Sequence, residues 1–197
     1  MGLNYGYFWS DLRFDSKLDV AIDRRGVTGT VELRPTPRMT LQLGAGAVFA
    51  GHLDTVGTRH ELGPGWLAAL AFTYQLLDGR EDRPFLLLSG SLGASGARTR
   101  QELPVRADAE SFLAIDARAG AVVGKTLWRT LSPYAGARVF AGPVFWRFQG
   151  EDRTGTDRYH YQLALGLLAS LPKSVDLYAE IAPLGERAVA VGGGFAF

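Results

Sequence analysis

The chain has 197 residues and a formal net charge of +1, from 21 Lys and Arg against 20 Asp and Glu. This balance excludes a protein that binds nucleic acid mainly by neutralising phosphates. Cysteine is absent, which excludes disulfides, thiolate metal sites and a cysteine nucleophile. Hydrophobic residues make up 47% of the chain, so it can fold, and its length suits a single domain over residues 1–197.

The first residues show no basic segment followed by an apolar stretch, so we expect no signal peptide within this sequence. The longest uncharged stretch, 62–77, contains glycine and proline and falls short of the roughly 18 apolar residues of a membrane-spanning helix. These features fit either a cytoplasmic protein or a mature chain whose leader is absent. The pattern described next favours the second interpretation.

Taken in chain order, most segments alternate apolar residues with small or polar ones, which is the two-residue period of a β-strand. The alternation is clear in 12–22, 39–49, 111–123 and 159–171. Together with the turn residues between segments, it predicts ten strands at 11–23, 26–35, 38–51, 65–77, 84–97, 110–127, 133–148, 158–171, 174–183 and 186–197.

Short turns alternate with longer charged loops, which we expect at 52–65, 98–109 and 149–157. Pro143 cannot donate to a strand ladder, so we place it at the outer end of its strand. Tyr5, Tyr7 and Trp9 precede the first predicted strand and receive no assignment.

The polar face of these strands mixes charge with many small residues. Examples are Gly44, Gly46, Ser89, Ser91, Gly120, Gly136, Gly192 and Gly194. Small residues make a poor soluble core, but they let a narrow barrel curve and leave room for long side chains from the opposite wall. The apolar face then points outward to lipid. The sequence therefore predicts an all-β fold, a closed antiparallel transmembrane β-barrel of ten strands. An eight-stranded barrel with residues 1–35 as an extension is the alternative.

Aromatic residues support the membrane interpretation because they gather at the two ends of the predicted strands. One group lies near the long loops: Trp66, Phe145, Trp146, Phe148, Tyr159 and Tyr161. The other lies near the short turns: Phe85, Trp128, Phe195 and Phe197. Such bands are typical of the two interfaces of a transmembrane barrel, although strands favour aromatic residues in any case.

The last strand ends on Phe197, with Phe195, Val191 and Val189 at alternate positions before it and Gly193 interrupting the apolar series. This segment resembles the C-terminal assembly signal of bacterial outer-membrane β-barrel proteins. The resemblance implies an even number of strands, periplasmic termini, and recognition of Phe195 and Phe197 by the barrel-assembly machinery. It also implies residence in the outer membrane of a Gram-negative bacterium, with the lipid bilayer and lipopolysaccharide as partners.

Charged residues are expected on the inward face of the barrel. They are Glu32, Arg34, Asp116, Arg118, Arg138, Asp176 and Glu180, with Tyr178, Gln162 and His160 beside them. Buried charges are normally paired, so these side chains either plug the lumen with ion pairs or line a constricted, charge-selective pore.

Enzymatic motifs are weak. The three histidines, His52, His60 and His160, lack the spacing of metal ligands, and we expect no metal and no cofactor. His52 with Asp54, and His60 with Glu61, lie near one outer loop, where a rim hydrolase is the alternative to solvated loop charge. Four loop arginines are candidates for contact with lipid phosphates: Arg98, Arg100, Arg106 and Arg153.

These observations lead to a non-enzymatic outer-membrane barrel, either a narrow porin-like channel or a structural or surface protein with a charged lumen. A protease or lipid-modifying enzyme of the outer membrane is the alternative. A soluble, lipocalin-like binder is a third class, and it is contradicted if the protein needs detergent to stay dispersed.

Overall fold

The computed structural model describes residues 1–15, 17–79, 83–101 and 109–195, and the strands within these ranges form one antiparallel sheet. The strands are β1 (Gly2–Phe14), β2 (Leu18–Thr36), β3 (Met39–Thr55), β4 (Thr58–Leu62), β5 (Gly65–Asp78), β6 (Phe85–Gln101), β7 (Glu110–Gly124), β8 (Leu131–Ala141), β9 (Pro143–Phe148), β10 (Glu151–Asp157), β11 (Tyr161–Leu171), β12 (Val175–Gly185) and β13 (Arg187–Phe195). No helix in the described part of the chain is long and apolar enough to cross a membrane.

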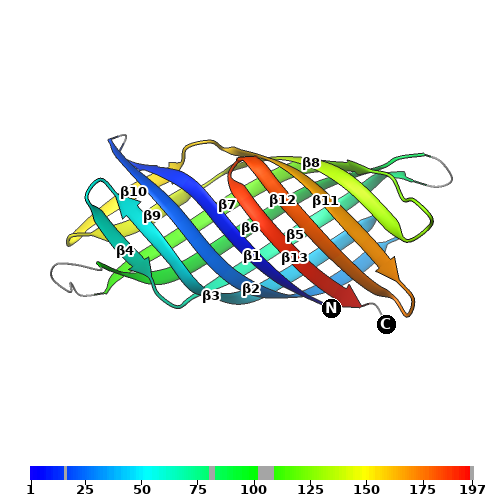
Figure 1. Cartoon of the computed structure of the whole chain (residues 1–197), viewed down its shortest axis with the longest axis horizontal. Helices are drawn as coiled ribbons and strands as arrows, with labels where there is room; N and C mark the ends of the chain where they lie inside the picture. The colour runs from blue at the N-terminus through cyan, green and yellow to red at the C-terminus, as the bar shows by residue number, and fades with distance from the viewer. Residues whose placement is uncertain (16, 80–82, 102–108, 196–197) are drawn as a thin grey trace.

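Ten of the described strands pair in a ring. The ring runs in the order β1, β2, β3, β5, β6, β7, β8, β11, β12, β13. It returns to its start because β13 pairs with β1 from Gly2↔Gly194 to Trp9↔Arg187. We refer to this ring as the belt. Both termini lie at one end of it (Figure 1).

Beyond the other end of the belt, the same wall continues as a second ring of eight described strands. Here β4 pairs between β3 and β6, while β9 and β10 lie between β7 and the end of β1. The distal ends of β1, β2, β3, β6 and β7 supply the remaining members. We refer to this ring as the extension. It occupies the left side of Figure 1, opposite the termini.

The change from ten strands to eight occurs at the tip of the β12–β13 hairpin. This hairpin turns at Gly185, which has a φ of +79°, and a Cβ there would meet the carbonyl oxygen of Tyr161 at 1.8 Å. Glycine is therefore required at this position. Past the tip, β10 pairs directly with β1 through Leu12↔Asp157. The β12–β13 hairpin therefore ends before the wall does, and beyond its tip β10 and β1 lie side by side.

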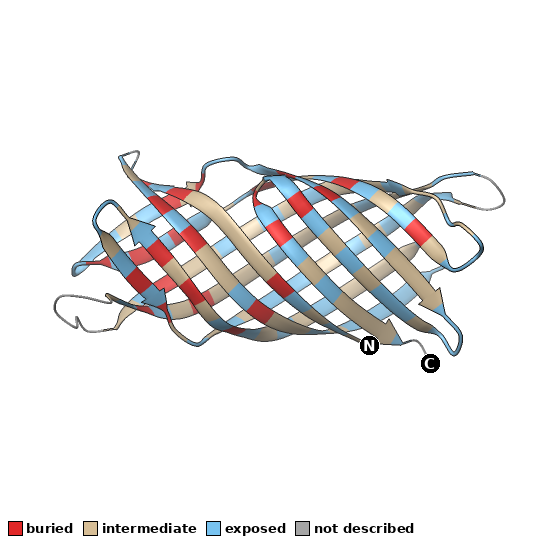
Figure 2. Cartoon of the chain, viewed as in Figure 1, coloured by how far each residue is buried: buried red, intermediate tan, exposed pale blue. Residues whose placement is uncertain are grey.

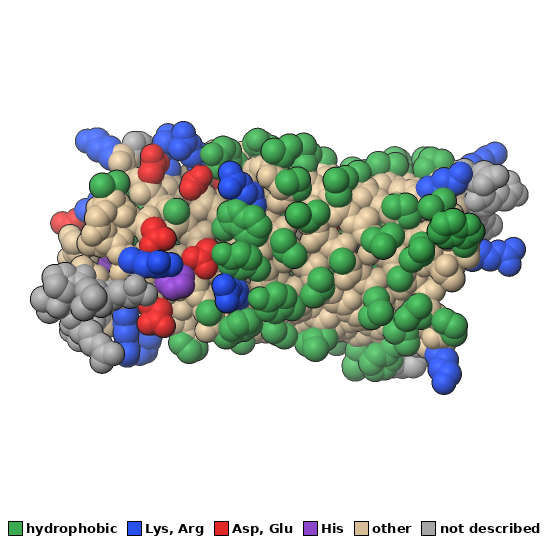
Figure 3. Space-filling view, viewed as in Figure 1, with side chains coloured by type: hydrophobic (Ala, Val, Ile, Leu, Met, Phe, Trp, Pro, Cys, Tyr) green, Lys and Arg blue, Asp and Glu red, His purple; other side chains and the backbone are tan. Residues whose placement is uncertain are grey.

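The apolar residues of the belt point outward. Leu163, Leu165 and Leu167 of β11 are 42%, 57% and 44% exposed, whereas Gln162 and Ala164, on the other face of the strand, are buried. The same alternation recurs around the ring, and hydrophobic side chains cover the belt surface between charged ends (Figure 3). The orientation expected from the sequence is confirmed.

The extension has the opposite arrangement, because its interior is apolar. A cluster of buried side chains fills it: Leu12, Phe14, Val20, Ile22, Val48, Leu53, Leu62, Phe112, Val144, Trp146 and Phe148. Buried residues gather at this end of the molecule (Figure 2). The outer end of the wall is thus packed like the core of a soluble domain.

Several predicted boundaries are wrong. The predicted strand 11–23 is instead the end of β1 and the start of β2, since the chain turns between Phe14 and Leu18. The turn expected at residues 24–26 lies within β2, and residues 2–10, which had no assignment, pair with both β2 and β13. The alternative in which residues 1–35 lie outside an eight-stranded barrel is therefore also wrong.

Two of the predicted charged loops are strands. The region 52–65 contains the end of β3 and all of β4, and 149–157 contains β10. Residues 102–108 of the third loop lie outside the described residues. Pro143 begins β9 at the junction with β8, as expected for a residue that cannot donate to the ladder.

The predicted aromatic band near the long loops is correct only in part. Trp66, Phe145, Tyr159 and Tyr161 are exposed on the outer surface. Trp146 and Phe148 are buried in the extension instead. At the other end Trp128 and Phe195 are exposed, Phe85 is half-buried, and Phe197 lies outside the described residues.

Candidate functional site in the interior

Two layers of charged side chains cross the interior of the belt. In the first, Arg118 of β7 donates from Nη1 and Nη2 to the two carboxylate oxygens of Glu186, at 2.7 and 3.0 Å. Its Nε donates to Asp116 at 3.0 Å, and the guanidinium lies 4.7 Å from the centre of the Phe140 ring. All three guanidinium nitrogens of Arg118 therefore bind carboxylates, and a bidentate pair fixes its plane.

The second layer lies nearer to the termini. Arg138 of β8 donates to both oxygens of Glu180 at 2.7 and 2.9 Å, and Tyr134 donates to the same carboxylate at 3.0 Å. Gln162 joins the two layers, because its Oε1 accepts from Arg138 at 2.7 Å while its Nε2 donates to the backbone oxygen of Glu186 at 3.1 Å. We refer to both layers together as the ionic network.

The structure brings together four of the seven inward charges expected from the sequence. Asp116, Arg118, Arg138 and Glu180 belong to the ionic network. The other three, Glu32, Arg34 and Asp176, are exposed near the short turns, and Glu32 accepts a hydrogen bond from Gln42. His160, expected beside these charges, is also exposed. These residues lie where the ring is open to solvent, so they need no ionic partner.

Glu186 and Arg24 are interior residues that sequence reasoning missed. Glu186 follows the tight turn at Gly185. The alternation of inward and outward residues restarts after this turn, so counting along β12 does not show which way the Glu186 side chain points. Arg24 was placed in a predicted turn, but it lies in β2 and points inward. Its Nη1 donates to Ser95 at 2.9 Å, and its guanidinium lies 5.6 Å from the Phe8 ring centre.

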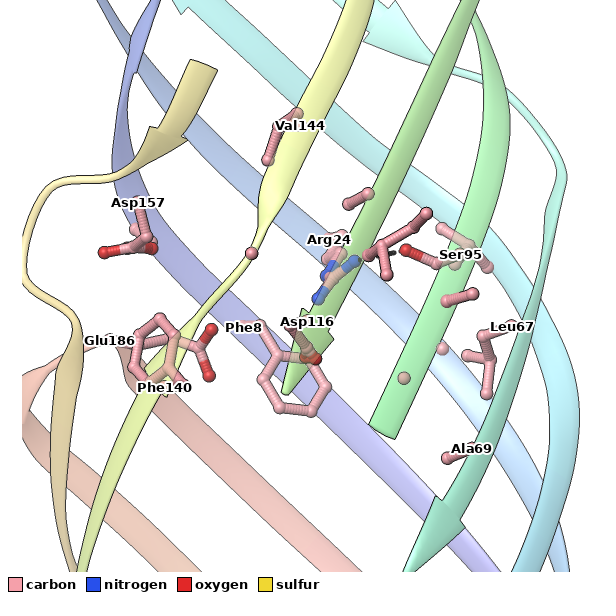
Figure 4. Close-up of a pocket in the computed structure, with 18 of the residues that line it drawn as sticks. Phe8, Arg24, Leu67, Ala69, Ser95, Asp116, Phe140, Val144, Asp157 and Glu186 are labelled. Carbon is pink, nitrogen blue, oxygen red and sulfur yellow. Dashed lines mark hydrogen bonds between the residues drawn. The ribbon is translucent and has the colours of Figure 1, made fainter. Parts of the chain in front are cut away.

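A cavity of about 360 Å³ lies between the ionic network and the apolar interior of the extension. In the view of Figure 4, Glu186 lies beside Phe140 at one side, Leu67 and Ala69 lie at the other, and Arg24 and Asp116 lie between them. Apart from Leu67, its wall on β5 and β6 carries small inward residues, which include Ala69, Ser91, Gly93 and Ser95. The cavity exists because these residues face Phe8, Phe140 and the arginines without filling the space between them.

His60 lies inside the extension rather than in a solvated loop beside Glu61. It is 3% exposed, its ring lies 5.1 Å from the Trp146 ring and 5.4 Å from the Phe148 ring, and its Nε2 has no hydrogen-bond partner. Burial lowers the pKa of His60, and the nearby charge of Glu110 opposes this shift only in part. His60 is therefore a neutral core residue.

The acidic residue that His52 contacts also differs from the prediction, which grouped His52 with Asp54. His52 Nδ1 lies 3.2 Å from Asp23, while Asp54 pairs with Arg59 at 3.4 Å. His52 and Asp23 are partly exposed on the outer surface. Among the described residues no group of three or more His, Cys, Asp or Glu is placed to hold a metal ion.

The four candidate lipid-contacting arginines differ in their surroundings. Arg98 and Arg100 are exposed on β6 in the extension. Arg153 points inward and donates to Asp15 at 3.2 Å and Glu151 at 2.8 Å. Arg106 lies outside the described residues.

No protein-family model matches this sequence, and no curated protein sequence matches it. Solved structures with a similar fold include the translocator domain of the autotransporter NalP from Neisseria meningitidis, with a TM-score of 0.50 and 14% identity over 100% of this chain and 89% of that one. They also include the transport unit of the autotransporter AIDA-I from Escherichia coli, with a TM-score of 0.49 and 10% identity over 100% and 89%. The outer membrane protease OmpT from Escherichia coli has a TM-score of 0.48 and 10% identity over 98% and 93%.

The likeness to the NalP domain concerns the fold alone, and it agrees with the outward apolar surface of the belt. The chain has the all-β, barrel-like fold of bacterial outer-membrane proteins, and the localisation expected from its sequence is that membrane.

Proposed function

We propose that this protein is a closed, ten-stranded transmembrane β-barrel whose lumen is sealed, and that it serves as a non-enzymatic structural or surface protein rather than as a channel. The observation that carries the proposal is the stacking of three obstacles along one axis. They are the Arg138–Glu180 layer, the Arg118–Glu186 layer and the apolar core of the extension. Partly buried ion pairs with two hydrogen bonds each hold their geometry and leave little freedom to open a path.

The extension gives this barrel a rigid part beyond the lipid. Its strands β4, β9 and β10 pair with the long strands of the belt and enclose their own apolar core, so they form an ordered platform rather than mobile loops. The exposure of Arg98 and Arg100 on this platform supports contact with lipopolysaccharide phosphates. Outward-facing Val189, Val191 and Phe195 on β13 support recognition by the barrel-assembly machinery; Phe197, also named for this role, lies outside the described residues.

Conductance in planar bilayers tests the seal. The reconstituted protein is expected to give no unitary current steps under conditions in which a porin, inserted in the same way, conducts. Leu165→Val, on the lipid face of β11, is the matched variant and is expected to be equally silent. Reproducible unitary steps from the folded wild-type protein would support the narrow channel instead.

A rim hydrolase is the second candidate, and the approach of His52 Nδ1 to Asp23 at 3.2 Å is the observation that favours it. A histidine oriented by a carboxylate is a general base in many hydrolases. A panel of ester, peptide and lipopolysaccharide substrates is expected to remain intact with the wild-type protein. Turnover that is lost in His52→Ala and kept in His60→Phe would establish the enzyme.

A further inference from the structure

The cavity beneath the extension contains a cation with most of its hydrogen-bonding capacity unused. Arg24 carries five N–H donors, and among the described residues it makes one hydrogen bond, to Ser95. It lines the cavity and keeps partial exposure there, although the wall surrounds it. Unsatisfied donors of a charged group in an enclosed space are costly, so this position favours an acceptor from outside the chain.

The carboxylates nearest to Arg24 are already engaged. Asp116 and Glu186 both accept from Arg118, whose three guanidinium nitrogens they bind. Their negative charge acts on Arg24 from a distance, but neither carboxylate forms an ion pair with it. The remaining acid of the cavity, Asp157, accepts from Ser10 and from the backbone of Tyr159. Among the residues described, Arg24 is thus an inward-facing arginine of the cavity without a carboxylate partner.

The rest of the lining is apolar. It includes Phe8, Leu12, Ile22, Leu67, Phe112 and Val144. A volume of about 360 Å³ lies within the range of roughly 300–1,000 Å³ found for small-molecule sites, which are mostly apolar with a few polar groups that fix orientation. A hydrocarbon tail suits the apolar walls, and a carboxylate suits Arg24 because both its oxygens can accept from one guanidinium.

We propose that this cavity binds a medium-chain monocarboxylate, with the head group on Arg24 and the tail against the apolar walls beneath the extension. The site does not depend on the barrel being non-conducting, so ligand binding and conductance are independent tests.

The experiment measures equilibrium binding of radiolabelled decanoate to the protein in lipid nanodiscs, with uptake by empty nanodiscs subtracted. Decanol and decyltrimethylammonium serve as probes with the same tail and a different head. We expect saturable binding of one decanoate per chain, weaker binding of decanol and none of the cation.

Three variants locate the site. Arg24→Gln is expected to weaken decanoate binding about tenfold to a hundredfold, the loss expected for charge-assisted hydrogen bonds, and to leave decanol binding unchanged. Ser91→Phe fills the cavity from β6 and is expected to abolish binding of both probes. Leu88→Ala, on the lipid face of the same strand and outside the cavity lining, is expected to bind like the wild type.

A second readout keeps the test decisive if a variant folds poorly. The carboxyl resonance of ¹³C-labelled decanoate is expected to shift when it binds the wild-type protein and to return toward its free position on competition with unlabelled decanoate. Binding that does not saturate, equal affinity for decanoate in the wild type and Arg24→Gln, or decanol bound as tightly as decanoate would overturn the proposal.

Discussion

The belt and the extension are two lengths of the same wall, and they enclose interiors of opposite chemistry. In the belt the apolar side chains face outward and the interior holds arginines, carboxylates and small residues. In the extension the interior is apolar, and charged residues such as Arg59, Glu61 and Arg100 face outward. The inversion indicates which medium surrounds each region, because the outer face of a barrel wall must match its surroundings. An apolar outer face suits lipid, and a charged outer face suits water.

The largest expected effect comes from emptying the extension. Trp146 is 1% exposed and its indole N–H donates to Thr99 at 3.0 Å, so Trp146→Ala leaves a cavity and removes the donor to the Thr99 hydroxyl. The loss of stability is expected to be about 3–5 kcal/mol, confined to the extension. Hydrogen exchange should show fast amides in β4, β9 and β10 and protected amides in β11.

Trp66→Ala is the matched control, because Trp66 is exposed on the outer surface of β5. It is expected to leave exchange in the extension unchanged. If Trp146→Ala unfolded the belt together with the extension, the two regions would be one cooperative unit and the comparison between them would lose its meaning.

Breaking the ionic network is expected to have a slightly smaller effect on the belt. Arg138→Met leaves the 12% exposed carboxylate of Glu180 with Tyr134 as its remaining side-chain donor, at a cost of about 3 kcal/mol. The double variant Arg138→Met/Glu180→Gln should recover part of that loss, because no charge then stays unpaired. Guanidinium unfolding from lipid vesicles measures both. Arg34→Met, at the exposed end, should lie within about 0.5 kcal/mol of the wild type.

The third prediction concerns the outer surface of the belt. Leu165→Arg places a charge in the middle of β11, where a transmembrane barrel loses about 2–4 kcal/mol. Leu171→Arg lies at the end of the same strand and should cost about 0–1 kcal/mol, because the side chain reaches the interface. Equal costs at the two positions would contradict the assignment of this face to lipid.

The sequence predicted the belt well because its two faces differ in chemistry. Leu163, Leu165 and Leu167 alternate with small or polar residues, and the same counting places Arg138 and Glu180 inside. Ten described strands pair in the belt, the number that the sequence predicted, although the first turn was misplaced. The turn after Phe14 contains neither glycine nor proline, and Leu12, Phe14 and Leu18 share one face across it, so the alternation gives no sign of the reversal.

The sequence predicted the extension poorly, because apolar residues lie on both of its faces near the rim. Phe145 and Trp146 were assigned to one aromatic band, yet adjacent residues in a strand point in opposite directions. Counting from Arg138 puts Trp146 on the inward face, so the signal was present. Nothing in the alternation predicted Arg24 or Glu186 as interior groups, since Arg24 was assigned to a turn and Glu186 to the first position of the last predicted strand.

The smallest expected effect is a pH dependence restricted to the extension. Burial lowers the pKa of His60 below its ordinary value of 6.5, with Glu110 acting in the opposite direction. Between these two pKa values the unfolded segment binds a proton that the folded core excludes, so stability is complete above pH 6.5 and falls as the pH falls through this window. Hydrogen exchange of β4 and β9 should therefore quicken on acidification relative to β11. The variant His60→Phe keeps an aromatic ring between Trp146 and Phe148 and should remove that dependence, whereas an unchanged pH profile in this variant would assign the effect to other groups.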